Sequence, residues 1–148
     1  MTRRPSESTV PYADAVWQAD AGDRRVLVID REDTSRQDAV AVLERLGFQV
    51  AWAADAGGAG MLFTRLQPHV LVADVETVAP DFEPLRSALE DLFGHNQPVP
   101  VVLIGSDKPR EAIEWVKAFV PKPLSFGNIE QLVAAVDALA PIADDTDR

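Results

Sequence analysis

Five short apolar runs alternate with amphipathic segments along this chain, and this alternation constrains the fold more than any other feature. The runs are residues 24–30, 48–53, 70–74, 99–105 and 118–120. Their branched apolar residues are typical of strands that are buried on both faces. Strict alternation of strand and helix through short loops indicates right-handed crossovers and a parallel sheet with helices on both sides. The sequence therefore predicts an α/β fold with a doubly wound, five-stranded parallel sheet.

Helical spacing of apolar residues predicts one helix after each strand. The first covers residues 36–46, with Thr34 or Ser35 as its N-cap and Gly47 at its end. The second follows an N-cap at Asp55. The remaining three are predicted at residues 81–93, at residues 111–117 and, after an N-cap at Ser125, at residues 129–139.

The two ends of the chain lack this pattern. Residues 1–23 are rich in Pro, Ser, Ala and Asp and are predicted to be a flexible extension, and residues 142–148 an acidic tail. The domain itself is predicted to span residues 24–141. Within the extension, the spacing of Tyr12, Val16 and Trp17 would put all three on one face of a short helix able to dock on the domain or on a partner. A disordered segment with a few stray apolar residues is the alternative.

Composition restricts the functional class. With 148 residues, of which 47% are hydrophobic, the chain has enough material for one domain core. A formal charge of −10 and a pI near 4.5 argue against direct binding to nucleic acid or anionic membranes. The absence of cysteine and the presence of only two histidines exclude thiolate chemistry and histidine-rich metal sites. No apolar run is long enough for a signal peptide or anchor, so a cytoplasmic protein is predicted.

Three chemically active residues stand at the carboxyl ends of predicted strands. Asp30 follows the first strand, Asp74 the third and Lys122 the fifth. In the common strand order 2-1-3-4-5 these ends lie at one edge of the sheet, where doubly wound folds bind their ligands. A single Asp at a strand end is most often only a turn or cap residue. The convergence of all three residues predicts a shared polar site.

Phosphoryl transfer to a carboxylate is the chemistry that such a site could support. Asp74 is predicted to be the nucleophile, Asp30 an acid beside a divalent cation, and Lys122 the charge that pairs with phosphoryl oxygens. A hydroxyl after the fourth strand would donate a further hydrogen bond to the phosphoryl group. Gly105 stands where strand geometry would put that hydroxyl, and Ser106 follows it, so Ser106 is the candidate.

These motifs, taken in chain order, make the protein resemble the receiver domain of two-component response regulators. They are VLVID ending at Asp30, LGFQV, PHVLVAD ending at Asp74, PVVLIGS, and FVPKPL around Lys122. The resemblance covers residues 24–140 and implies a flavodoxin-like, non-enzymatic domain. Asp74 would accept phosphate from a sensor histidine kinase or a phosphotransfer protein, with Mg²⁺ as the cofactor. The signal would pass to a downstream protein through the fourth helix, fifth strand and fifth helix.

The acidic pocket departs from the family pattern at Arg31. The family has a second acid there as a metal ligand, whereas a guanidinium has no lone pair to offer. Glu32 or Asp33 could supply the missing carboxylate, or Arg31 itself could take the cation's place beside Asp74. Glu76 could complete the coordination or repel a phosphoryl group. The candidate metal ligands are therefore Asp30, Asp74 and Glu76, and the binding of Mg²⁺ stays open.

The segment after the fourth strand also departs from the pattern. Residues 106–120 are too few for a full helix with its usual loop, so the fourth helix is predicted to be shortened. Phe119 holds the position of the family's rotating aromatic residue, and Trp115 lies nearby. Both are candidates for a switch or an interface, although packing in the core is the plainer interpretation of each.

The sequence does not decide between two functions, and it gives little support to a third. A phosphorylatable receiver is favoured slightly by the presence of Asp74 and Lys122, and a pseudo-receiver that only binds other proteins is favoured by Arg31 and Gly105. A small enzyme or flavin binder ranks last, because no Gly-rich phosphate loop follows the first strand. The sequence does not decide whether the chain forms a homodimer.

Overall fold

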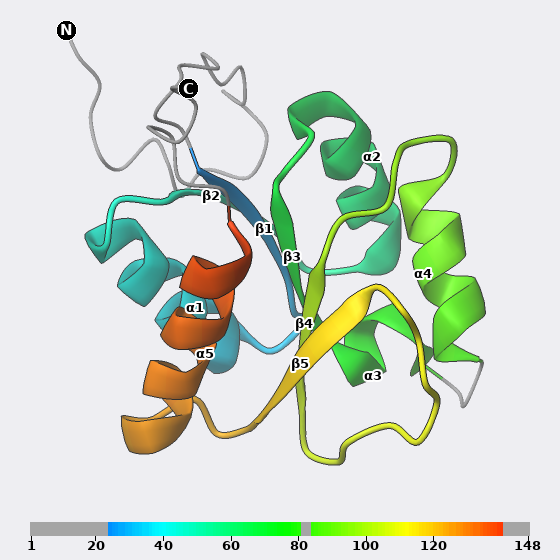
Figure 1. Cartoon of the computed structure of the whole chain (residues 1–148). Helices are drawn as coiled ribbons and strands as arrows, with labels where there is room; N and C mark the ends of the chain where they lie inside the picture. The colour runs from blue at the N-terminus through cyan, green and yellow to red at the C-terminus, as the bar shows by residue number, and fades with distance from the viewer. Residues whose placement is uncertain (1–23, 81–83, 141–148) are drawn as a thin grey trace, which may run out of the picture.

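A computed structural model describes residues 24–80 and 84–140, which form one sheet between two helical layers (Figure 1). The predicted extension, residues 1–23, and the predicted acidic tail, residues 142–148, lie outside the described residues, and so do Tyr12, Val16 and Trp17.

The sheet has five parallel strands in the order β2-β1-β3-β4-β5. Their bounds are β1 Arg25–Ile29, β2 Gln49–Ala53, β3 Val70–Asp74, β4 Val101–Gly105 and β5 Val116–Pro121. All five residues of β3 and of β4 are buried, as expected for strands that are covered on both faces. The predicted doubly wound sheet and its strand order are confirmed.

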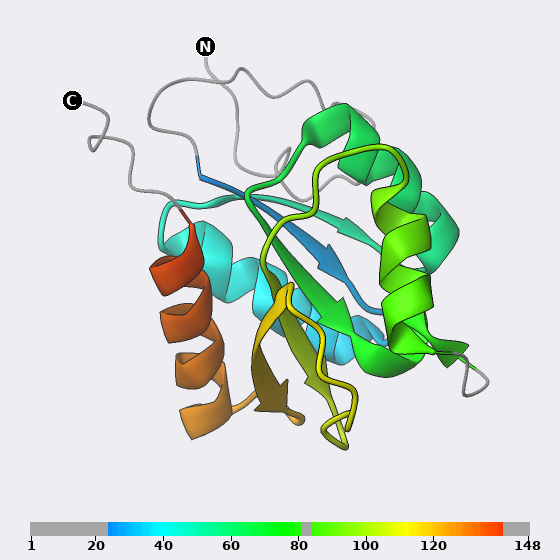
Figure 2. The same ribbon diagram turned by 45° about the vertical axis from the view of Figure 1, so that its right-hand side comes forward.

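Two helical layers cover the sheet (Figures 1 and 2). The helices are α1 Asp33–Arg45, α2 Ala56–Leu66, α3 Val75–Val78, α4 Leu85–Phe93 and α5 Phe126–Leu139. Leu43 of α1 and Val136 of α5 pack in the apolar cluster on one face. Phe63 of α2 and Leu89 of α4 belong to the cluster on the other face. The carboxyl ends of β1, β3 and β5 therefore open at one edge, between the two layers.

The helix ends match the sequence predictions in part. Asp55 is the N-cap of α2, and its carboxylate accepts a hydrogen bond of 2.7 Å from the backbone N–H of Gly58. Gly47 lies just after α1 with a positive φ of 98°, as a helix-ending glycine should. The predicted N-cap of α1 was wrong, because the helix begins at Asp33 after Glu32. Ser125 is the N-cap residue of α5, although its side chain makes no capping hydrogen bond.

The helix predicted at residues 81–93 is shorter than expected. Residues 81–83 lie outside the described part, and α4 begins only at Leu85, after Pro84. A separate single turn, α3, follows β3 directly and was not predicted. Its formation is local, because the Asp74 side chain accepts the free backbone N–H of Thr77 in the first turn.

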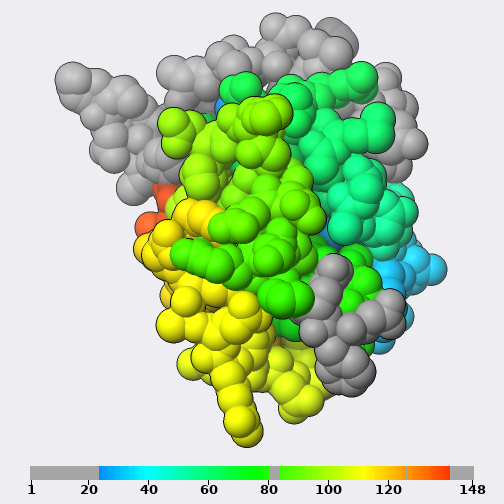
Figure 3. All heavy atoms as spheres, turned by 90° about the vertical axis from the view of Figure 1, so that its right-hand side faces the viewer, coloured from blue at the N-terminus to red at the C-terminus, as the bar shows by residue number. Residues whose placement is uncertain are grey.

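The helix predicted at residues 111–117 was wrong. All residues of the segment 106–115 are described, none is helical, and β5 already begins at Val116 (Figure 1). In the space-filling view the segment lies at the surface, next to the residues of α4 (Figure 3). The Glu111 carboxylate instead accepts hydrogen bonds from the backbone N–H groups of Leu85 (2.9 Å) and Arg86 (3.3 Å), at the start of α4. These hydrogen bonds hold the segment against the start of α4 as a loop without helical structure.

Candidate functional site

Lys122 brings together the carboxylates at the open edge of the sheet. Its Nζ atom lies 3.1 Å from Asp30 Oδ2, 3.0 Å from Asp74 Oδ1 and 2.9 Å from Glu32 Oε1. The side chains of Asp30 and Asp74 are 0% and 6% exposed, whereas that of Glu32 is 59% exposed. The predicted neighbours Asp30, Asp74 and Lys122 therefore do lie in one polar hollow. We call these four residues the Lys122 cluster.

Asp74 has hydrogen-bond partners on both of its carboxylate oxygens. Oδ1 faces Lys122, while Oδ2 accepts hydrogen bonds from the Thr77 backbone N–H (3.0 Å) and the Thr77 hydroxyl (2.7 Å). The same hydroxyl oxygen accepts a hydrogen bond of 3.0 Å from the backbone N–H of Arg31. Thr77 of α3 thus contacts both Asp74, the predicted nucleophile at the end of β3, and the backbone of Arg31, which follows β1.

Thr77 was not identified from the sequence, although a signal was present. An Asp followed three residues later by Thr is a common N-cap arrangement, because the Asp side chain can accept the N–H and the hydroxyl of the third residue. A cap was the plainer interpretation of a single Asp at a strand end, but the prediction of Asp74 as a nucleophile did not take Thr77 into account. A residue cannot both cap a helix with one oxygen and keep that oxygen available for chemistry.

Asp30 is held by a second set of donors. Its carboxylate accepts hydrogen bonds from the Ser35 hydroxyl and from the Glu32 backbone N–H. Arg36 donates to the Asp30 carbonyl oxygen at 3.0 Å, and its guanidinium stacks 4.3 Å from the Trp52 ring. Arg36 is 8% exposed, and its guanidinium pairs with Asp33 at 2.6 Å, so a second buried cation lies next to the Lys122 cluster. From the sequence, Ser35 was predicted only as a possible N-cap of the first helix, and Arg36 was given no role.

Arg31 does not take the place of a cation beside Asp74. Its Nη2 atom lies 3.3 Å from Glu76 Oε1, and the two side chains are 60% and 68% exposed. Glu76 is therefore paired at the surface, while Asp30 and Asp74 are buried around Lys122. Within residues 24–80 and 84–140, no group of three acidic or histidine side chains is arranged to hold a metal. The buried carboxylate oxygens of Asp30 and Asp74 face the ammonium of Lys122 in this structure.

The other three candidate residues lie outside the Lys122 cluster. Ser106 is exposed and lines a hollow beside Arg31 and Glu76. Phe119 is half-buried against the apolar cluster under α2 and α4. Trp115 makes an edge contact with Phe93, with 5.2 Å between the ring centroids. Phe119 and Trp115 therefore both pack in the core, as the plainer interpretation of their sequence positions expected, and their predicted switch role is untested.

Replacing Glu32 by glutamine tests how the Lys122 cluster responds to pH. Hydrogen bonds from Lys122 and then Ser35 lower the pKa of Glu32 from its ordinary value of 4.5. A carboxyl with a lowered folded pKa stabilises the fold above its unfolded pKa and loses that contribution as the pH falls through the folded value. We expect Glu32→Gln to flatten the loss of stability below about pH 4.5, measured by urea unfolding across the acid range.

Glu130→Gln is the matched control for this measurement, because Glu130 lies exposed on α5. A Glu32→Gln profile that still falls as steeply as the wild type would contradict the assignment.

The pKa of Lys122 is shifted in the opposite direction. Burial alone would lower its pKa, but the hydrogen bonds with Glu32, Asp74 and Asp30 outweigh burial and raise the pKa above its ordinary value. Its stabilising contribution is therefore complete below the unfolded pKa and is lost only as the pH rises through the folded value.

The fold of this chain is the one found in receiver domains of response regulators. The receiver domain of the Francisella response regulator 1452 is 24% identical, with a TM-score of 0.63 over 79% of this chain and 96% of that one. Vibrio cholerae chemotaxis protein CheY4 is 18% identical, with a TM-score of 0.63 over 79% and 98%. The response regulator domain of Thermotoga maritima CheB is 20% identical, with a TM-score of 0.61 over 79% and 96%. Identities this low show the common fold only.

A family model gives the narrower assignment. Residues 25–135 match the model described as flagellar regulatory protein FleQ, and this match covers most of the chain. The protein therefore belongs to the FleQ flagellar regulatory family. A search of curated proteins found no match. No helix within the described residues is long and apolar enough to cross a membrane.

Proposed function

We propose that this protein is a receiver-fold interaction module in a flagellar regulatory pathway, and that it acts without phosphorylation of Asp74. The observation that carries the proposal is the state of the Asp74 carboxylate. Both of its oxygens are engaged, one by Lys122 and the other by two donors from Thr77. The side chain is 6% exposed, so an incoming phosphoryl group would first have to displace these partners.

Phosphoryl transfer to a carboxylate needs a free oxygen and compensation of the charge that builds up on the phosphoryl oxygens. Lys122 could supply part of that charge, but it already balances Asp30, Glu32 and Asp74. Arg31 replaces the acid that would hold a metal and pairs with Glu76 at the surface. Gly105 supplies no hydroxyl. We infer that the Lys122 cluster holds the strand ends together and that the protein does not use Mg²⁺.

A phosphoaccepting receiver is the second candidate, and one observation favours it. Asp30, Asp74 and Lys122 do lie together in the arrangement that the chemistry requires. In that case Thr77 would have to leave Oδ2 before Asp74 could attack a phosphohistidine of a kinase or phosphotransfer protein. Under either candidate the partners are proteins, since a chain with a net charge of −10 is poorly suited to nucleic acid. The setting we propose is the cytoplasm.

Treatment of the full chain with acetyl phosphate, or with beryllofluoride, in the presence of Mg²⁺ separates the two candidates. We expect no added mass on the intact protein and no change in the backbone NMR shifts around Asp74. The matched variant is Arg31→Asp/Thr77→Ala/Gly105→Ser, which restores an acid and a hydroxyl and frees Oδ2. This variant is expected to gain shifts on addition of Mg²⁺ and beryllofluoride.

Labelling of the wild-type chain that disappears in Asp74→Asn would overturn the proposal and leave the phosphoaccepting receiver. Labelling that survives in Asp74→Asn would show a different acceptor. If neither the wild type nor Asp74→Asn is labelled, the interaction module stands. Because Thr77→Ala alone removes the hydroxyl but keeps the backbone N–H, it measures how far the side chain by itself protects Asp74.

A further inference from the structure

A groove lies on the face of β5 where the helix predicted at residues 111–117 is missing. It measures about 550 Å³ and lies between the loop 108–114 and the start of β5. Its apolar wall includes Leu103, Ile113, Val116 and Phe119. Val116 and Phe119 are only half-buried, unlike the wholly buried residues of β3 and β4. We call this hollow the β5 groove.

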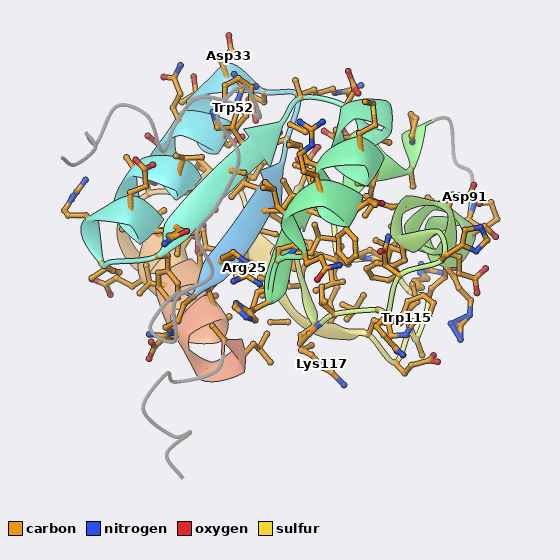
Figure 4. The ribbon with its side chains drawn as sticks, turned by 90° about the horizontal axis from the view of Figure 1, so that it is seen from above. Arg25, Asp33, Trp52, Asp91, Trp115 and Lys117 are labelled. Atoms are coloured by element: carbon orange, nitrogen blue, oxygen red, sulfur yellow. The ribbon has the colours of Figure 1, made fainter. Side chains whose placement is uncertain are left out.

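Unpaired cations surround the β5 groove. Lys108 and Lys117 line it, and Arg110 belongs to the same loop. All three are exposed, and none has an ion-pair partner among residues 24–80 and 84–140. Lys117 points outward from the sheet beside Trp115 (Figure 4).

The two acids that line the groove, Glu111 and Glu114, are already engaged. Glu111 accepts the backbone N–H groups at the start of α4, and Glu114 pairs with Arg86 at 2.7 Å. The rim of the groove is therefore positive on a protein whose overall charge is −10. A charge pattern of this kind favours an occupant that is apolar and acidic.

The N-terminal extension carries the complementary chemistry. Its residues 12–20 include the large apolar residues Tyr12, Val16 and Trp17, and Asp14 and Asp20 lie among and after them. Aromatic side chains flanked by acids match an apolar hollow with a cationic rim. A second copy of the chain matches less well, because in a two-fold contact the cations of one groove would face those of the other.

The chain between Trp17 and the start of β1 is long enough for the extension to reach the β5 groove. Parallel strands place the starts of β1 and β5 at the same edge, three strand spacings of about 4.8 Å apart, or about 14 Å. Seven residue steps separate Trp17 from Arg24, and each step spans up to about 3.4 Å when extended, which makes about 24 Å. The extension can therefore pass around the sheet edge to the groove. A tethered segment also meets its site at an effective concentration on the order of millimolar.

We propose that residues 12–20 of the N-terminal extension occupy the β5 groove of the same chain, with Tyr12, Val16 and Trp17 against its apolar wall and Asp14 and Asp20 on its cationic rim. The extension then fills the space that a helix between β4 and β5 would otherwise cover. A protein that docks on β5 has to displace it. The extension is thus an internal competitor for that surface, whether or not Asp74 is ever phosphorylated.

A spin label on the extension tests this proposal in the full-length protein. The chain contains no cysteine, so Gln18→Cys provides a single site for a nitroxide. We expect the amide signals of residues 106–119 to lose intensity strongly, while those of α1 and α5 on the opposite face keep theirs. Adding Tyr12→Ala/Val16→Ala/Trp17→Ala to the labelled chain is expected to restore the signals of the groove.

The cationic rim has its own variant, Lys108→Glu/Lys117→Glu, which is expected to restore the same signals in part. The unchanged amide spectrum of β1 and β3 is the control for folding. Loss of intensity on another face, or none at all, would overturn the proposal.

Mixing spin-labelled chains with isotope-labelled chains that carry no nitroxide identifies contacts between molecules. Attenuation in that mixture as strong as within one chain would assign the groove to a second copy and would also overturn it.

Discussion

The variant Lys122→Met is expected to unfold with a free energy about 3–5 kcal/mol smaller than that of the wild type, the range found when one partner of a buried ion pair is removed. The Lys122 ammonium lies 3.1 Å from Asp30 and 3.0 Å from Asp74, whose side chains are 0% and 6% exposed. Methionine keeps much of the apolar stem but leaves two buried carboxylates facing each other. Urea unfolding measures the change as a lower midpoint at an unchanged slope.

Lys117→Met is the control, because Lys117 is an exposed lysine on β5, the strand that ends directly before Lys122, and its loss should change the stability by no more than about 0.5 kcal/mol. The double variant Lys122→Met/Asp74→Asn is expected to recover part of the loss, since it removes one of the two uncompensated charges. A loss below about 1 kcal/mol for Lys122→Met would mean that water or Arg36 compensates the carboxylates, and that the Lys122 cluster does not hold the sheet edge together.

The second large effect is expected for Phe93→Ala, which should cost about 3–5 kcal/mol. Phe93 is 2% exposed at the end of α4, and its ring lies 5.2 Å from those of both Phe63 and Trp115. It therefore joins α2, α4 and the loop that stands in place of a helix. Truncation leaves a cavity and removes two aromatic contacts. Chemical unfolding gives the free energy, and a shift of the Trp115 indole N–H signal in the NMR spectrum of the folded protein would report the loosened loop.

Phe93→Leu is the matched variant, because it keeps most of the volume and is expected to cost less than about 1.5 kcal/mol. If Phe93→Ala and Phe93→Leu cost the same, the site collapses around the smaller side chain and the loop does not depend on this ring. A Trp115 indole N–H signal unchanged by Phe93→Ala would contradict the proposed link between α4 and the loop 106–115.

The fold was largely predictable because its signal is local and repeated. The strands β1, β3 and β4 are runs of branched apolar residues, and turn or cap residues such as Asp55 before α2 and Gly47 after α1 separate the elements. An error of a few residues at one helix end leaves the order of elements intact. The predicted sheet order is therefore correct although the predicted N-cap of α1 was wrong and α5 begins at Phe126, before the predicted start at residue 129.

The loop after β4 was predicted wrongly because long-range contacts decide its structure. Residues 111–117 contain good helix formers, but Glu111 accepts hydrogen bonds from α4, 25 and 26 residues away. Arg86 also pairs with Glu114 and stacks 5.0 Å from the Trp115 ring. These interactions outweigh the weak local preference for helix. Nothing in the segment itself identifies its partners on α4.

The amino-acid sequence alone determined that Asp30, Asp74 and Lys122 meet at one edge, because parallel strands bring their carboxyl ends together. Only the tertiary structure decided what each oxygen contacts. Lys122 contacts Asp30, which lies 92 residues earlier in the chain. The short helix α3, which was not predicted, places the Thr77 hydroxyl where it donates to the second carboxylate oxygen of Asp74. The reason is physical: hydrophobic periodicity specifies which face of an element is buried, whereas a hydrogen bond depends on the positions of atoms that only the packed chain sets.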